Sequence, residues 1–209
     1  VIRPAIASVL PTVDKSVVLL DSGASLDVKP KVLFQFAVMG SKLAEALFDI
    51  ESPKIGLLNN GEEESKGREL EKSAFKLLNS SSLNFIGNVE GRDFATSKVD
   101  VFVTDGFTGN VVLKTLEGTA KLQQNLISDS LKQNLFKPFL PAVQKALKPV
   151  KDQLNPDKTN ASYLLGVNGL VTIGHGSSKQ EAIMNGINYT NESINKDFIG
   201  KFSDAIREL

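Results

Sequence analysis

Short apolar runs rich in Val, Ile, Leu and Phe alternate along the chain with longer stretches of helical periodicity. Five of these runs are bounded by Gly, Pro, Asn, Asp or Ser, which is typical of strands. The predicted strands cover residues 16–20, 54–58, 83–87, 99–104 and 170–174.

Helical periodicity fills the segments between the strands. In residues 31–50 the apolar and small residues share one face of a helix; they are Leu33, Phe36, Ala37, Gly40, Leu43, Ala44 and Leu47. Residues 62–79 predict a second helix, with acidic residues in its first turn and Lys76 in its last. This alternation predicts an α/β fold, a mostly parallel sheet covered by helices.

Residues 119–158 interrupt the alternation with a largely helical pattern broken by Lys137-Pro138-Phe139-Leu140-Pro141. The segment holds seven lysines and three aspartates, so it carries a positive charge in a chain of zero formal net charge. We therefore expect an inserted helical hairpin at 119–158 and one α/β domain made of 1–118 and 159–209.

The turn after the fourth predicted strand is rich in residues suited to binding an anion. Ligands of a parallel sheet bind at the carboxyl ends of its strands, and helix N-termini attract anions. Glycines let a ligand approach the backbone, Thr108 or Asn110 could cap the next helix, and Lys114 would add a charge. The turn residues are Asp105, Gly106, Phe107, Thr108, Gly109 and Asn110. The alternative is an ordinary strand–helix connection with a satisfied cap.

Two further turns follow predicted strands. Residues 59–67 hold Glu63 and Lys66 in an acidic run, which either contributes to a site or stabilises a helix N-terminus. Residues 87–93 hold Asn88 and Glu90, which either bind a substrate or hold the loop together.

A fourth Gly-rich turn, at residues 174–178, holds the single histidine, His175, beside Gly176, Ser177 and Ser178. It departs from the dinucleotide-binding fingerprint, because Lys179 replaces the third glycine. The two interpretations left are an acid–base or anion-binding histidine and a structural one.

Composition excludes several classes of protein. Without cysteine the chain has no disulfide or thiolate nucleophile, and with one histidine a zinc site is not expected. The P-loop and Gly-x-Ser-x-Gly motifs are absent. The balanced charge gives no reason to expect nucleic acid as a partner, and we find no signal peptide or spanning segment. We expect neither a metal nor a cofactor.

In this order, the turns resemble the phosphate acyltransferase family of bacterial phospholipid synthesis. The resemblance is carried by LLDSGASLDVKP (19–30), LLNNGEEESKG (57–67), FIGNVEGRD (85–93), DVFVTDGFTGNVVLKTLEG (100–118) and LLGVNGLVTIGHGSS (164–178). The family begins with a Gly-rich segment that is missing here, so the chain corresponds to its C-terminal two-thirds. It also departs from the family at Ser25 and at residues 159–163.

The resemblance implies a fold similar to phosphotransacetylases, with Rossmann-like layers. The implied reaction transfers a fatty acyl group from acyl carrier protein to inorganic phosphate. The implied protein is cytoplasmic, associates with the inner face of the membrane, and is a homodimer. The hairpin tip, with Phe136, Phe139 and Leu140 flanked by lysines, would then contact the bilayer; the alternative is a dimer contact.

Turn chemistry and resemblance together predict one cleft. The turn at 105–110 and Lys114 would hold phosphate, and Gly176, Ser177 and Ser178 would donate hydrogen bonds, with His175 polarising the carbonyl. Asn88, Glu90, Glu63 and Lys66 would line the same cleft. Two alternatives are a phosphotransacetylase-like enzyme that uses acyl-CoA and an inactive scaffold of the phospholipid pathway.

Overall fold

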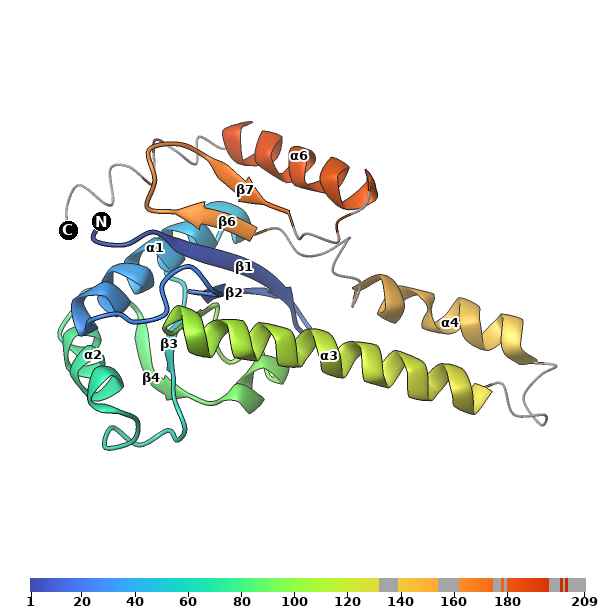
Figure 1. Cartoon of the computed structure of the whole chain (residues 1–209), viewed down its shortest axis with the longest axis horizontal. Helices are drawn as coiled ribbons and strands as arrows, with labels where there is room; N and C mark the ends of the chain where they lie inside the picture. The colour runs from blue at the N-terminus through green and yellow to red at the C-terminus, as the bar shows by residue number, and fades with distance from the viewer. Residues whose placement is uncertain are drawn as a thin grey trace.

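A mixed sheet of seven strands forms the centre of the computed structural model, which describes residues 1–131, 139–153, 162–174, 178, 180–195, 200 and 202. The order across the described sheet is β4-β3-β5-β2-β1-β6-β7 (Figure 1). The strands are β1 (Ala5–Pro11), β2 (Ser16–Leu20), β3 (Ile55–Leu58), β4 (Phe85–Val89), β5 (Val101–Val103), β6 (Ser162–Leu165) and β7 (Val171–Ile173).

Strand direction divides the sheet into two halves. β2, β5, β3 and β4 are mutually parallel, whereas β1 is antiparallel to both of its neighbours, β2 and β6. β6 therefore regains the direction of β2, and β7 opposes it. Five of the seven strands share one direction, which confirms the predicted α/β fold with a mostly parallel sheet.

Alternating side chains give the sheet two buried faces. Val18, Leu20 and Val101 face one core, which helices α1 (Pro30–Phe48) and α2 (Glu69–Asn79) cover. Leu19 and Phe102 face the other core, where the 3₁₀-helix η1 (Gly91–Ala95) contributes Phe94. Phe94 stacks on Phe102 with ring centroids 3.8 Å apart. Helices on both faces explain why β2, β3 and β5 read as continuous apolar runs.

The prediction missed two strands and misplaced one helix start. β1 and β6 were not predicted because their small and polar residues, as in ASVL and SYLL, weaken the apolar pattern. α2 begins at Glu69, not at residue 62. Gly67 has φ +89°, which a right-handed helix excludes, so the acidic run that precedes it belongs to a loop.

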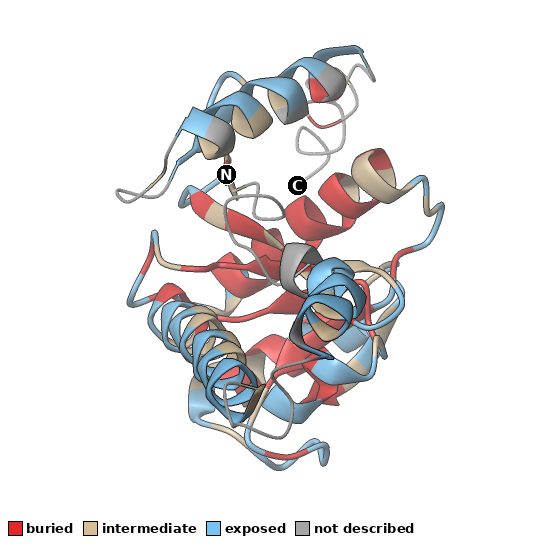
Figure 2. Cartoon of the chain, turned by 90° about the vertical axis from the view of Figure 1, so that its right-hand side faces the viewer, coloured by how far each residue is buried: buried red, intermediate tan, exposed pale blue. Residues whose placement is uncertain are grey.

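Two helices, α3 (Gly106–Leu131) and α4 (Leu140–Gln153), project beyond the sheet, as Figure 1 shows. Figure 2 shows that burial concentrates in the sheet and α1, while the projecting helices are largely exposed. Only Gly106 and Gly109 of α3 are buried. α3 continues unbroken across residue 118, where we expected the α/β domain to give way to the hairpin. That division of the chain stays a prediction. At the other end of the sheet, α6 (Gln180–Asn195) packs on β7.

Candidate functional site

The carboxyl ends of β2, β3, β4 and β5 meet at one edge of the sheet because these strands are parallel. The residues that follow them there are Asp21, Asn59, Glu90 and Thr104-Asp105. The sequence-predicted turns at 59–67, 87–93 and 105–110 therefore lie along one edge, as expected.

The turn after β5 is a capped helix start whose polar groups bond within the protein. α3 begins at Gly106, and the Asp105 carboxylate accepts a hydrogen bond from the Thr108 amide at 2.7 Å. The Gly106 amide donates to the Ser25 carbonyl at 2.8 Å. The predicted caps, Thr108 and Asn110, lie inside the helix instead, because the 2 % exposed Asp105 already caps it. Two amides of the expected cradle are thus occupied by protein groups.

Close packing explains the two glycines of this turn. A Cβ on Gly109 would lie 1.9 Å from the Asp21 carbonyl oxygen, and one on Gly106 would lie 2.8 Å from Asp21 Oδ2. Both glycines therefore let the first turn of α3 approach the loop after β2. Ligand access, the reason that the sequence suggested, is not needed to account for them.

Asp21 is a buried anion that the sequence analysis did not select. Its side chain is fully buried and accepts hydrogen bonds from four backbone amides, those of Ile6, Gly23, Ala24 and Ser25, at 2.7–3.0 Å. The signal available in the sequence was Asp21-Ser-Gly-Ala-Ser at a strand end, a pattern typical of an Asx turn. Asp21 therefore joins β1, β2 and the following loop.

Arg68 joins two of the turns. Its guanidinium forms ion pairs with Glu71 in α2 and with Asp105 before α3. The hydrogen bonds to Glu71 first, and then to Asp105, raise the pKa of Arg68 above its ordinary value. Arg68 was not among the predicted site residues, and its place beside Asp105 follows from the neighbouring positions of β3 and β5.

The loop at residues 59–67 presents Lys66 at the same edge. Asn59 Nδ2 donates to the Lys66 carbonyl at 3.2 Å, and a Cβ on Gly61 would lie 2.7 Å from Lys66 Cγ. The exposed Lys66 ammonium has no ion pair within the described part of the chain. In contrast, Lys114 Nζ lies 2.8 Å from Glu117 Oε2 on α3.

The acidic side chains of this loop differ in their surroundings. Glu62 accepts a hydrogen bond from Lys98 at 2.8 Å, and this bond is the main reason why its pKa is lowered. Glu63 is exposed, and its carbonyl accepts a hydrogen bond from Asn88 Nδ2 at 2.9 Å. Glu90 pairs with the exposed Arg92. The buried Asn88 thus contacts the backbone of the loop at residues 59–67. A common cleft lined by Glu63, Lys66, Asn88 and Glu90 stays a prediction.

Gly174, the first residue of the turn that holds His175, leaves the sheet at the opposite end from the other predicted turns. β7 is antiparallel to β6, so Gly174 leads toward the edge opposite Asp105. A Cβ on Gly174 would lie 3.6 Å from Ser178 Oγ, which places Ser178 there as well. The structure therefore does not bring Ser178 into the expected common cleft. His175, Gly176 and Ser177 lie outside the described residues, and their roles stay predictions.

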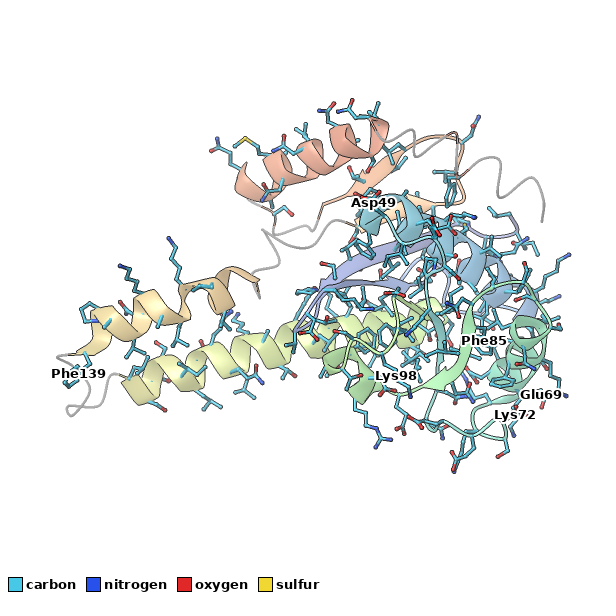
Figure 3. All side chains as sticks on the ribbon, turned by 180° about the vertical axis from the view of Figure 1, so that it is seen from behind. Asp49, Glu69, Lys72, Phe85, Lys98 and Phe139 are labelled. Carbon is cyan, nitrogen blue, oxygen red and sulfur yellow. The ribbon has the colours of Figure 1, made fainter. Side chains whose placement is uncertain are left out.

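Part of the predicted membrane tip also lies outside the described residues. Phe136 is among these, and nothing is described of the Leu140 side chain. Phe139 is 63 % exposed and lies at the far end of the projecting helices, as Figure 3 shows. Among the described helices, none has the length and hydropathy to cross a bilayer. Among the described residues, the Asp and Glu side chains form no cluster suited to a metal ion.

The fold is that of phosphotransacylases. The branched-chain phosphotransacylase of Enterococcus faecalis V583 superposes with a TM-score of 0.57 at 14% identity, over 92% of this chain and 64% of that one. The phosphotransacetylase EutD of Staphylococcus aureus gives a TM-score of 0.53 at 14% identity, over 93% and 55%.

The family follows from closer relatives. The family model described as "Fatty acid synthesis protein" matches residues 1–201, and the chain belongs to this family. It is 42% identical over 209 residues to the phosphate acyltransferase of Thermosipho melanesiensis, and 43% identical over 205 residues to that of Thermoanaerobacterium thermosaccharolyticum. These matches cover 99% and 98% of the chain but 62% of each relative, so the chain spans about three fifths of their length.

Proposed function

We propose that the protein transfers a fatty acyl group from acyl carrier protein to inorganic phosphate, as a step of phospholipid synthesis. The observation that carries this proposal is the 42% identity to a phosphate acyltransferase over 99% of the chain. The phosphotransacylase fold agrees with it, because the acyl-to-phosphate chemistry belongs to the same class.

The reaction needs binding and charge stabilisation more than it needs an enzyme nucleophile. A phosphate oxygen attacks the thioester carbonyl, the C–S bond breaks, and the carrier's thiolate leaves with the electron pair. The product is an acyl phosphate. Holding phosphate against the carbonyl supplies proximity, and donors to the developing oxyanion lower the barrier further. A chain without cysteine is compatible with this direct route.

Among the predicted lysines, Lys66 is the better candidate to hold phosphate. Its ammonium is exposed at the edge where the parallel strands end, whereas Lys114 is paired with Glu117. Asn110 is exposed one helical turn into α3 at the same edge, and we keep it as a candidate donor. The exposed Glu63 and the half-buried Glu90 border this surface. Asn88 is buried beneath this surface and contacts it through the Glu63 carbonyl.

The complete protein tests the reaction directly. We expect acyl phosphate from long-chain acyl carrier protein and inorganic phosphate, measured as hydroxamate after trapping with hydroxylamine. Preference for acyl-CoA would favour the phosphotransacetylase alternative, and no product from either donor would favour a scaffold. Lys66→Ala should lower kcat/KM for phosphate about tenfold, the loss of a single charge-assisted contact. Lys76→Ala, at an exposed position in the last turn of α2, serves as the control and should stay within about twofold.

We also propose that the protein works as a homodimer at the cytoplasmic face of the membrane. The projecting helices support both ideas, because α3 exposes Leu122 and Leu126, and α4 begins beside the exposed Phe139. Light scattering of the complete protein measures the mass, and a monomer would overturn the dimer.

Vesicle flotation tests the membrane contact. Phe139→Glu with Leu140→Glu should abolish binding to anionic vesicles, and unchanged binding would contradict it.

A further inference from the structure

A β-bulge in β4 turns Asn88 toward the loop that carries Lys66. The parallel pairing of β3 with β4 shifts from Ile55–Phe85 to Leu57–Asn88, so β4 holds one extra residue there. Gly87 lies within this stretch with φ +105°, and a Cβ on it would meet nothing within 4 Å. Gly87 is therefore required for its conformation and not for space. Bulges of this kind re-aim the side chains next to them, and Asn88 and Val89 are both buried.

Of the two polar atoms in the Asn88 side-chain amide, only one has a hydrogen-bond partner among the described residues. Asn88 is 4 % exposed, and its Nδ2 donates to the Glu63 carbonyl at 2.9 Å. Its Oδ1 is buried with no hydrogen-bond partner among the described residues. A buried, unpaired acceptor costs about 1–3 kcal/mol. An apolar residue would avoid this cost, so stability alone does not explain an asparagine at this position.

The bond from Asn88 continues into the backbone of Lys66. The Lys66 amide donates to the same Glu63 carbonyl at 3.0 Å, and Asn59 holds the Lys66 carbonyl from the other side. Asn59 itself is tied to β4, because its amide donates to the Val89 carbonyl at 2.8 Å. The backbone at Lys66 is thus fixed through two contacts, both of which begin in the last two residues of β4.

We propose that Asn88 is a positioning residue that sets the place of Lys66 through the Glu63 carbonyl. The inference rests on the proposed phosphate-binding role of Lys66 and goes beyond it. Asn88 does not touch phosphate. It fixes the turn from which the Lys66 ammonium reaches phosphate. The bulge at Gly87 orients the Asn88 side chain toward that turn.

The chain offers a control just before the other end of β4, at the exposed Asn84. Asn84 Nδ2 donates to the Ser52 carbonyl at 2.9 Å, the same kind of bond at the edge away from Lys66. Asn88→Asp and Asn84→Asp each replace the donor by a carboxylate of the same shape. In the complete protein, Asn88→Asp should raise the KM for phosphate about tenfold, with a smaller change in kcat and in the KM for the thioester. Asn84→Asp should leave all three unchanged.

Combining substitutions separates a positioning role from general damage. If Asn88 acts through Lys66, Asn88→Asp should add nothing to the phosphate KM of Lys66→Ala. Asn88→Ser, which removes the donor without adding charge, should reproduce the KM rise if Asn88→Asp does not fold. Additive effects, or a phosphate KM within twofold of wild type in both Asn88 variants, would overturn the proposal. If Lys66→Ala leaves the phosphate KM unchanged while product still forms, the proposed phosphate-binding role of Lys66 is contradicted as well. Absence of acyl phosphate from wild type contradicts the proposed function instead.

Discussion

Two loops at the same edge of the sheet use their polar groups in opposite ways. The turn at residues 105–109 has the glycines, acid and helix start expected of an anion site, yet Asp105 and Ser25 occupy two of its amides. The loop at residues 59–67 has an acidic sequence that suits a helix N-terminus as well as it suits a site. It nevertheless exposes Lys66 without an ion pair among the described residues.

The difference shows that glycines at a strand end have two separate uses. At Gly109 the missing side chain makes room for the protein's own backbone at Asp21. At Gly67 and Gly87 it permits a positive φ. Only contacts in three dimensions separate these uses, because both give the same letter in the sequence.

The largest expected effect tests the packing of the first turn of α3. Gly109→Ala places a Cβ 1.9 Å from the Asp21 carbonyl oxygen, and backbone on both sides must move. We expect a loss of about 3 kcal/mol in the free energy of unfolding. Urea denaturation measures it.

Gly118→Ala is the control in the same helix. Gly118 is exposed, and a Cβ there would meet nothing within 4 Å. This substitution should stabilise the protein by about 0.5–1 kcal/mol, because alanine favours helix. If both substitutions stabilise, Gly109 is not a packing glycine and the turn regains its interpretation as an open cradle.

A smaller loss is expected at the buried carboxylate. Asp21→Asn turns one acceptor oxygen into an amide group that faces the Ser25 N–H, and removes the charge that all four amides share. We expect about 2 kcal/mol of destabilisation, measured by the same denaturation. Asp14→Asn, at an exposed aspartate, should change nothing. Equal stability of the two variants would show that the four amides do not need an anion.

The smallest expected effect concerns the link between the two loops. Arg68→Gln removes the cation that Asp105 and Glu71 share, but the Arg68 side chain is 59 % exposed and solvent screens the pairs. We expect a loss of about 1 kcal/mol that shrinks as salt is raised. Arg68→Lys should recover part of it. A loss that does not depend on salt would argue that packing of the Arg68 stem, not charge, joins the loops.

The sequence alone determined the fold class and the edge where the candidate site lies. Apolar runs such as VVLL in β2 and VFV in β5 specify buried strands through local pattern, and alternation with helices specifies parallel pairing. The family also followed from the sequence, because its motifs are contiguous.

Only the tertiary structure decided which polar group is left for a ligand. Asp105 caps α3 through a local bond to the Thr108 amide, but only the fold brings Ser25, from another loop, to the Gly106 amide. The antiparallel return of β7 directed Gly174 away from this edge, and no local pattern encodes strand direction. Lys66 and Asn88 are linked through the Glu63 carbonyl because β3 and β4 are neighbours in space. Glu63 and Asn88 are 25 positions apart, and the sequence does not reveal their contact.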